Sequence, residues 1–144
     1  MSGEFQLLDA FKDKDVVCDF PLCRVLMENK EFPWILLIPR RSNIRQMNQL
    51  CGEDRLQLME EITVASNLME KLFPTDILNV AAIGNKTPQL HIHIISRKMD
   101  DSLWPEVVWG RQMQKLSDAS RNDRLGKIQA AFAEASAAFS YPKN

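Results

Sequence analysis

The feature that most constrains the fold is the alternating stretch at residues 89–95, Gln-Leu-His-Ile-His-Ile-Ile. Side chains two residues apart on a β-strand point to the same side. The leucine and the next two isoleucines therefore share an apolar face, which predicts a strand packed against helices. The other face carries Gln89, His91 and His93, which include both histidines of the chain. An ordinary sheet has little need of such a row, so this face is the candidate functional site.

Two longer segments have the pattern of amphipathic helices. Residues 53–73 place apolar side chains at three- and four-residue spacing, which predicts a helix of about five to six turns that ends before Pro74. Residues 120–140 repeat this spacing, and Ser120 with Asp123 predicts a start of the capping-box type. Both segments need a sheet or another helix to cover their apolar stripe.

The remaining apolar runs predict two strand pairs. We expect a short helix at residues 7–11 and strands at residues 20–27, 34–38, 77–83 and 90–96. Pro39 stops the second strand because proline cannot donate to a ladder. Polar turns at residues 28–31 and 84–88 make each pair antiparallel. The order of strand pair, helix, strand pair and helix predicts the α+β class, an antiparallel sheet with its helices on one face.

Length and charge limit the function classes. The 144 residues, 45% hydrophobic and 26% charged, suffice for one core, so residues 1–144 are interpreted as one domain. A net charge of -1 argues against nucleic-acid binding. No signal peptide or membrane-length apolar run is recognisable, which predicts a cytoplasmic protein without membrane contact. Cys18, Cys23 and Cys51 are expected to be reduced and buried.

The two same-face imidazoles leave several functions open. Neutral imidazole can attack phosphorus to give a phosphoramidate that water hydrolyses. Two imidazoles can also begin a zinc site, but zinc needs three or four ligands and no further residue completes the set, so no metal and no cofactor are predicted. A purely structural role is the third reading. Basic residues flank the strands, and one or two of them could steer a phosphate: Arg40, Arg41, Arg45, Lys86, Arg97 and Lys98.

The motif resembles that of the histidine-triad (HIT) superfamily of nucleotide hydrolases and transferases, His-φ-His-φ-His-φ-φ with φ apolar. Residues 89–95 match it except at the first position, where Gln89 stands for His. A strand at residues 35–40 that ends in Pro and a basic residue also resembles the family. The resemblance covers about residues 20–109. It looks closest to a bacterial subgroup with Pro-Gln-Leu-His-x-His and two later tryptophans, here Trp104-Pro105 and Trp109.

The resemblance implies a fold, an assembly and a reaction. It implies a HIT-like five-stranded antiparallel sheet with two main helices, and a homodimer. His91 would attack the α-phosphate of a purine nucleotide derivative, and His93 would bind or orient that phosphate. Gln89 would lie where a histidine normally contacts the leaving group. The substrates would be nucleotide phosphoramidates, phosphoanhydrides or dinucleoside polyphosphates, cleaved or transferred through a nucleotidyl-His91 intermediate.

Further site residues follow from the same comparison. Asn79 and Asn85 match positions associated with substrate contacts, and the basic Lys86 lies beside them. An apolar pocket for the base would involve Leu26, Asn29 and Ile38. Trp104 and Trp109 are expected to anchor a segment on the core or on a dimer interface, with base stacking as the second choice.

Two other functions stay open beside the enzyme. A nucleotide-binding module with little turnover is one, because a glutamine at position 89 cannot transfer a proton to the leaving group. A metal-dependent protein that uses His91 and His93 is the other.

Overall fold

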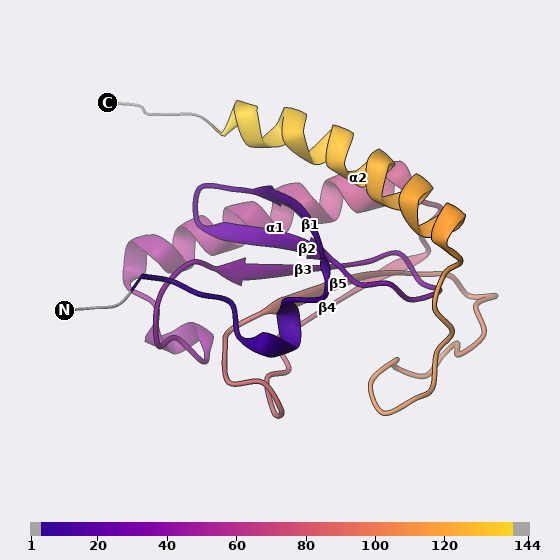
Figure 1. The fold of residues 1–144 in the computed structure, drawn as a ribbon, viewed down its shortest axis with the longest axis horizontal. Coiled ribbons are helices and arrows are strands. Elements are labelled where there is room, and N and C mark those ends of the chain that lie inside the picture. Colours follow the sequence, from indigo (N-terminus) through magenta and orange to yellow (C-terminus); the bar gives the residue numbers. More distant parts are fainter. Residues whose placement is uncertain (1–3, 140–144) are drawn as a thin grey trace.

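The computed structural model describes residues 4–139, which form one antiparallel sheet and two long helices (Figure 1). The strands are β1 (Asp15–Asp19), β2 (Cys23–Met27), β3 (Trp34–Pro39), β4 (Ile77–Ala81) and β5 (Ile92–Arg97). The helices are α1 (Gly52–Leu72) and α2 (Asp118–Ala138), and short 3-10 turns are η1 (Asp9–Phe11) and η2 (Met47–Gln49). The predicted α+β class with five strands and two helices is confirmed.

Several predicted boundaries were wrong. The strand expected at residues 20–27 is the shorter β2, and the preceding strand β1 was missed because only Val17 of its five residues is buried. β3 includes Pro39, which pairs with Cys23 at its end. α2 begins before Ser120, because the side chain of Ser117 caps it by accepting a hydrogen bond from the Ser120 amide at 3.2 Å.

The three cysteines are free thiols, but their burial differs. Cys23 is buried and Cys18 is half-buried, whereas Cys51 is exposed. The predicted burial was therefore wrong for Cys51. Cys51 is the N-cap residue of α1 and belongs to neither of the two apolar clusters that cover the sheet.

The sheet order is β1-β2-β3-β5-β4, so β5 has a neighbour on each side. His93 pairs with Leu36 of β3 and with Ala81 of β4. A residue at such a position is held by two ladders of backbone hydrogen bonds. The fold therefore places the predicted functional strand in the interior of the sheet, where its backbone is paired on both sides.

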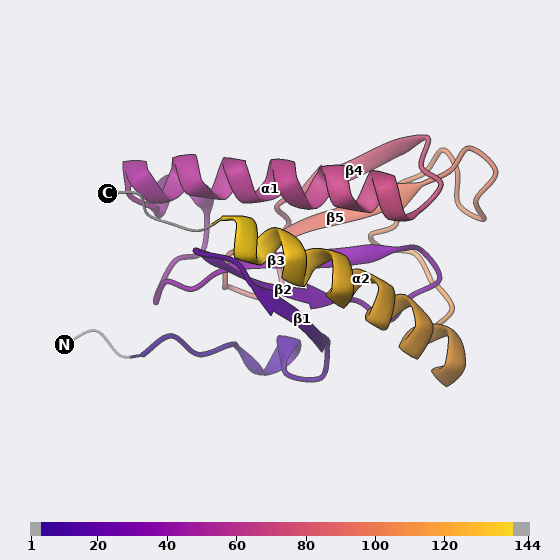
Figure 2. The same ribbon diagram turned by 90° about the horizontal axis from the view of Figure 1, so that it is seen from above.

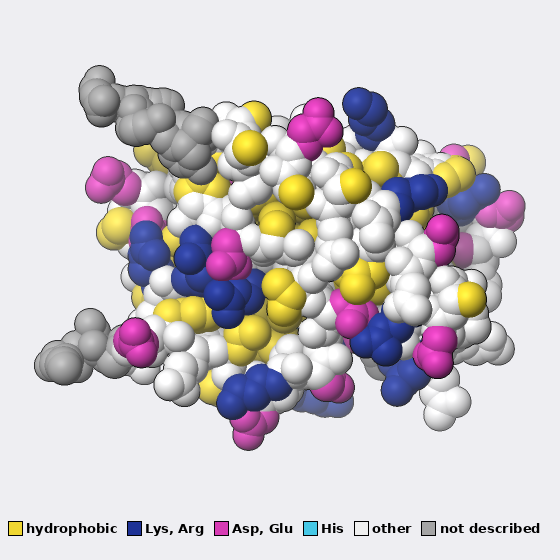
Figure 3. Space-filling view, turned by 45° about the horizontal axis from the view of Figure 1, so that its top comes forward, with side chains coloured by type: hydrophobic (Ala, Val, Ile, Leu, Met, Phe, Trp, Pro, Cys, Tyr) yellow, Lys and Arg dark blue, Asp and Glu magenta, His cyan; other side chains and the backbone are white. Residues whose placement is uncertain are grey.

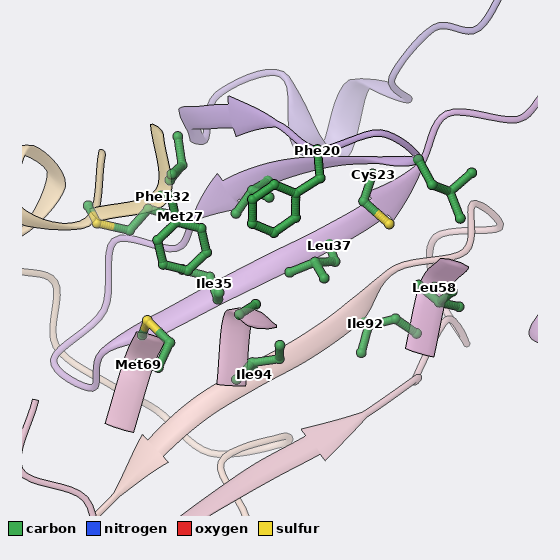
Figure 4. Packing of buried hydrophobic residues seen from close by; sticks show 14 of the residues in the cluster. Phe20, Cys23, Met27, Ile35, Leu37, Leu58, Met69, Ile92, Ile94 and Phe132 are labelled. Carbon is green, nitrogen blue, oxygen red and sulfur yellow. The ribbon is translucent and has the colours of Figure 1, made fainter. Parts of the chain in front are cut away.

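Both helices cover one face of the sheet (Figure 2). Figure 4 shows Ile92 and Ile94 of β5 in the same buried cluster as Met69 of α1 and Phe132 of α2. Burying aliphatic and aromatic side chains in this way is the main favourable term for folding. The predicted apolar face of residues 89–95 is thus confirmed.

The opposite face is covered by irregular chain. The N-terminal segment with η1, and the connection between β5 and α2, run below the sheet in Figure 1. They complete a second apolar cluster, which contains Phe11, Leu26, Phe32, Trp34, Leu36, Ile38, Ile95 and Val108. The two histidines lie on this covered face and are both buried.

The outer surface of the helix side is of mixed charge. Figure 3 shows acidic and basic side chains interspersed on it, with no histidine among them. Within residues 4–139, no helix is long and apolar enough to span a membrane.

Candidate active site

His91 lies directly before β5 and is held by a backbone contact. Its Nδ1 is 2.7 Å from the carbonyl oxygen of Gln89. Because a carbonyl oxygen only accepts, Nδ1 carries the hydrogen of the neutral ring and Nε2 keeps its lone pair. The Phe11 ring packs against the imidazole edge to face, with centroids 4.9 Å apart. The ring is therefore held so that Nε2 is the nitrogen with a free lone pair.

His93 is anchored by an indole. Trp34 Nε1 donates a hydrogen bond to His93 Nδ1 at 3.1 Å, and an indole N–H can only donate. In the neutral ring the hydrogen must therefore lie on Nε2, which leaves that atom to bond the backbone of Ile83. The bond from the indole thus fixes the orientation of the imidazole.

Burial keeps His93 neutral. Loss of hydration lowers the pKa of His93 to about 4, and the neighbouring His91 is the next cause. The hydrogen bond to the Ile83 backbone opposes this shift, and the charge of Lys14 adds slightly to it. Because the centroids of the two imidazoles are 4.9 Å apart, an uncharged His93 spares His91 a cationic neighbour when His91 reacts.

Gln89 faces the N-terminal segment. Its Oε1 accepts a hydrogen bond from the Leu8 amide at 2.9 Å, and its Nε2 donates to the Gln6 carbonyl at 2.8 Å. The amide is thereby engaged at both ends and ties the N-terminal segment to the histidine strand. The expected contact of Gln89 with a leaving group does not match this geometry. Sequence spacing held no signal for it, because the partners are 81 and 83 residues away.

A cleft of about 780 Å³ opens beside His91. It is formed by the turn around η2, by the loop between β4 and β5, and by the start of the histidine strand. Gly84 lines it without a side chain, and a Cβ there would lie 3.2 Å from the Thr87 carbonyl oxygen, a tight approach, and 3.7 Å from His91 Cε1. The lining residues are Arg45, Gln46, Met47, Asn48, Ala82, Gly84, Asn85, Leu90 and His91.

The cleft brings together only part of the predicted polar substrate contacts. Asn85 lines it together with His91. Lys86 is exposed on the same loop but does not line the cleft. Asn79 lies elsewhere, because its Oδ1 accepts a hydrogen bond from Arg97 Nη1 at 3.0 Å. A substrate contact of Asn79 therefore does not match the structure, and its amide belongs to the buried arginine cluster instead.

The predicted base pocket is closed. Leu26 and Ile38 have no exposed surface, because the second apolar cluster, including Phe11 and Val108, covers them. Asn29 Oδ1 accepts a hydrogen bond from the Leu116 amide at 3.2 Å, which fixes the chain before α2. These residues match the expected side of the sheet, but the space above them is filled by the protein itself.

The two tryptophans anchor the connection between β5 and α2. The Trp109 ring lies 5.1 Å from His93 and 6.3 Å from Trp34, centroid to centroid. The Trp104 ring lies 5.7 Å from the guanidinium carbon of Arg97. This packing agrees with the first interpretation of these residues, anchorage on a core.

Sequence reasoning missed two contributors to the site and did not single out a third. Trp34 and Phe11 contact the histidines from segments far away in the chain, and no sequence motif predicts either contact. Arg45 was only one of several basic residues near the strands. A stronger signal was its place in the polar crossing after β3, which leads to the wall of the cleft.

A protein that holds two buried imidazoles at a central strand, one of them lining a cleft, can attack an electrophile with imidazole. The HIT domain family model matches residues 10–100. A solved histidine triad protein from Marinobacter aquaeolei is 36% identical, with a TM-score of 0.86, over 92% of this chain and 98% of that one. The chain belongs to the HIT domain family.

Other solved relatives agree. A histidine triad protein from Bradyrhizobium japonicum is 33% identical over 90% of this chain and 98% of that chain, with a TM-score of 0.85. One from Sinorhizobium meliloti is 26% identical over 88% and 96% of the two chains, with a TM-score of 0.83. No curated protein sequence matched the chain. Members of the family are generally nucleotide-binding hydrolases or transferases.

Proposed function

We propose that this protein, a member of the subgroup with Gln at the first triad position, hydrolyses or transfers a nucleotidyl group at the α-phosphate of a purine nucleotide derivative. The reaction runs through a covalent nucleotidyl-His91 intermediate. The observation that carries this proposal is the contact of His91 Nδ1 with the Gln89 carbonyl oxygen, because it leaves Nε2 as the nucleophile of a residue that lines the cleft. The cleft volume of about 780 Å³ is within the usual range for small-molecule sites.

The proposed chemistry has two displacements. His91 Nε2 forms a bond to phosphorus while the bond to the leaving group breaks, and the leaving group takes the electron pair. The imidazole becomes cationic, and the Gln89 carbonyl oxygen then accepts a stronger, charge-assisted bond from Nδ1–H. Water next attacks phosphorus, the P–N bond breaks, and the released proton passes to solvent, which restores neutral His91. In a transfer reaction, another nucleophile replaces water.

In this scheme the neighbours of His91 are positioning residues. His93 packs edge to face against the His91 ring, and its Nδ1 accepts from Trp34, so we assign it to orienting His91. Asn85 remains the polar side chain of the loop best placed to contact the substrate. Gln89 secures the N-terminal segment, which brings Phe11 against His91.

Turnover without a metal is the first test of this proposal. We expect EDTA-treated protein to release AMP from an adenosine phosphoramidate or from diadenosine tetraphosphate at the untreated rate. The described residues 4–139 hold no group of three or more His, Cys, Asp or Glu that could bind a metal, which supports this expectation. AMP binding without product from any such substrate would instead favour a binding module. Loss of activity on chelation, restored by zinc, would favour a metal-dependent protein.

We also propose that the protein is a homodimer. β4 is an edge strand of the sheet, and Ile77 and Val80 on it are about half exposed, at 50% and 46%. An exposed apolar edge strand favours pairing with another chain. Light scattering at micromolar concentration is expected to give twice the chain mass, and a monomeric mass there would contradict the proposal.

The cytoplasm is the proposed location. All three cysteines are free thiols, and the exposed Cys51 is the kind of thiol that a reducing compartment preserves. Fractionation of cells that express the untagged chain tests this, and recovery from the culture medium or membranes would contradict it.

A further inference from the structure

Arg45 has an unusual position among the arginines of this chain. Every other arginine of the described residues 4–139 donates to a carboxylate or to a backbone carbonyl. Arg45 is exposed, and its guanidinium has no such partner there. An unpaired guanidinium keeps all of its donors for a ligand, and its planar fork suits the oxygens of a phosphate.

The backbone beneath Arg45 is fixed. Gln49 Oε1 accepts hydrogen bonds from the Arg45 amide at 2.7 Å and from the Gln46 amide at 3.1 Å. The Gln46 side chain in turn accepts from the Gln49 amide, so that η2 has a reciprocal cap. The side chain of Arg45 is therefore exposed on a turn whose backbone is held in place.

The side chains that line the cleft favour an anionic ligand. Arg45 and His91 both line it, and no Asp or Glu is among the lining residues. A single phosphate attacked by His91 must lie at the histidine strand. Arg45 reaches the cleft from the η2 side, so it is available to a second anionic group of the same substrate.

The first triad position points to the same chemistry. Gln89 cannot transfer a proton at any useful pH, and its amide is occupied by Gln6 and Leu8. A leaving group that departs as a stable anion needs no proton, whereas an amine does. An anionic leaving group would benefit from a cationic partner instead.

We propose that Arg45 is the specificity-determining residue that binds the phosphate of the leaving group. This inference rests on the proposed chemistry of His91. When His91 Nε2 forms its bond to the α-phosphorus, the P–O bond of a phosphoanhydride breaks and the leaving phosphate takes the electron pair. Its added negative charge is then paired with the Arg45 guanidinium, and water later hydrolyses the P–N bond. The enzyme thus selects nucleotides with anionic leaving groups over phosphoramidates of amines.

The kinetic test compares leaving groups with the same adenylyl part. Adenosine 5′-tetraphosphate and diadenosine tetraphosphate have anionic leaving groups, and an adenosine phosphoramidate of tryptamine has an amine. We expect Arg45→Gln to lower kcat/KM about 10- to 100-fold for the first two, and less than about 2-fold for the third. Arg45→Lys should retain part of the wild-type preference for the anionic leaving groups, because lysine keeps the positive charge but lacks the planar fork of the guanidinium. Lys71→Gln, an equal charge change at an exposed position of α1, is the matched control.

A binding measurement separates this inference from the proposed function. We expect Arg45→Gln to weaken binding of adenosine 5′-tetraphosphate about 10-fold and to leave AMP binding within about 2-fold. If these binding changes are found but the wild-type protein shows no turnover, the His91 chemistry is overturned and the role of Arg45 in binding stands. If the wild type turns over and Arg45→Gln shows the same preference between anionic and amine leaving groups, the role of Arg45 alone is overturned. Equal losses for both ligands, or no binding of either by the wild type, would also overturn it.

Discussion

Replacing His91 with alanine is expected to lower kcat/KM for AMP release by at least about 10³-fold. The variant loses the atom that forms the bond to phosphorus, and no other side chain of the cleft wall supplies an equivalent nitrogen, since His93 does not line it. Steady-state kinetics with an adenylyl phosphoanhydride measures the loss. The expected size corresponds to about 4 kcal/mol of transition-state stabilisation.

Folding must be preserved for this comparison to be informative. His91 is only 6% exposed and packs on Phe11, so the thermal transition of His91→Ala is recorded beside its activity. Thr63→Ala on the exposed side of α1 controls for a polar-to-alanine change away from the cleft. A folded His91→Ala that retains more than about one tenth of the wild-type kcat/KM would show that water attacks the substrate directly.

Glu61→Leu is expected to lower the free energy of unfolding by about 3–5 kcal/mol. The Glu61 carboxylate of α1 is completely buried. It accepts hydrogen bonds from the amides of Leu22 and Cys23, each at 2.8 Å, and from Gln57 Nε2 at 2.8 Å. Leucine fits an apolar site but leaves the amides of Leu22 and Cys23 without this acceptor, and each buried unsatisfied amide costs about 1–3 kcal/mol.

Urea unfolding of the two variants at position 61 measures this effect. Glu61→Gln keeps one acceptor oxygen, so it is expected to cost less than Glu61→Leu, about 1–2 kcal/mol. The m-value should stay constant while the midpoint falls. A Glu61→Leu protein as stable as the wild type would show that the turn satisfies its amides in another way.

The sequence was most informative where a pattern is local. The alternation at residues 89–95 and the helical spacing at residues 53–73 predicted β5 and α1 because burial on one face requires them. β1 was missed for the same reason, since its outer position at the edge of the sheet leaves just Val17 buried. β4 is also an edge strand and has no buried residue, but its apolar run at residues 77–83 still predicted it. Pattern reasoning therefore failed at the strand that lacks both a continuous apolar run and a buried face.

The surroundings of the histidines could not be predicted in this way. The bond from Trp34 to His93 joins residues 59 apart, and those from Gln89 to the N-terminal segment span more than 80. Such contacts depend on the path of irregular chain across the sheet, which spacing does not encode. For the same reason Leu26 and Ile38 were expected around a pocket, whereas Phe11 and its neighbours cover them.

Intact mass after mixing the protein with an activated adenylyl donor tests the central claim most directly. The wild type is expected to gain one adenylyl group, and digestion at mildly basic pH, which spares a phosphoramidate, should locate it on the peptide that contains His91. His91→Ala should gain none under the same conditions. An adduct of equal amount on His91→Ala, or turnover by the wild type with no adduct at any time before the steady state, would contradict the account.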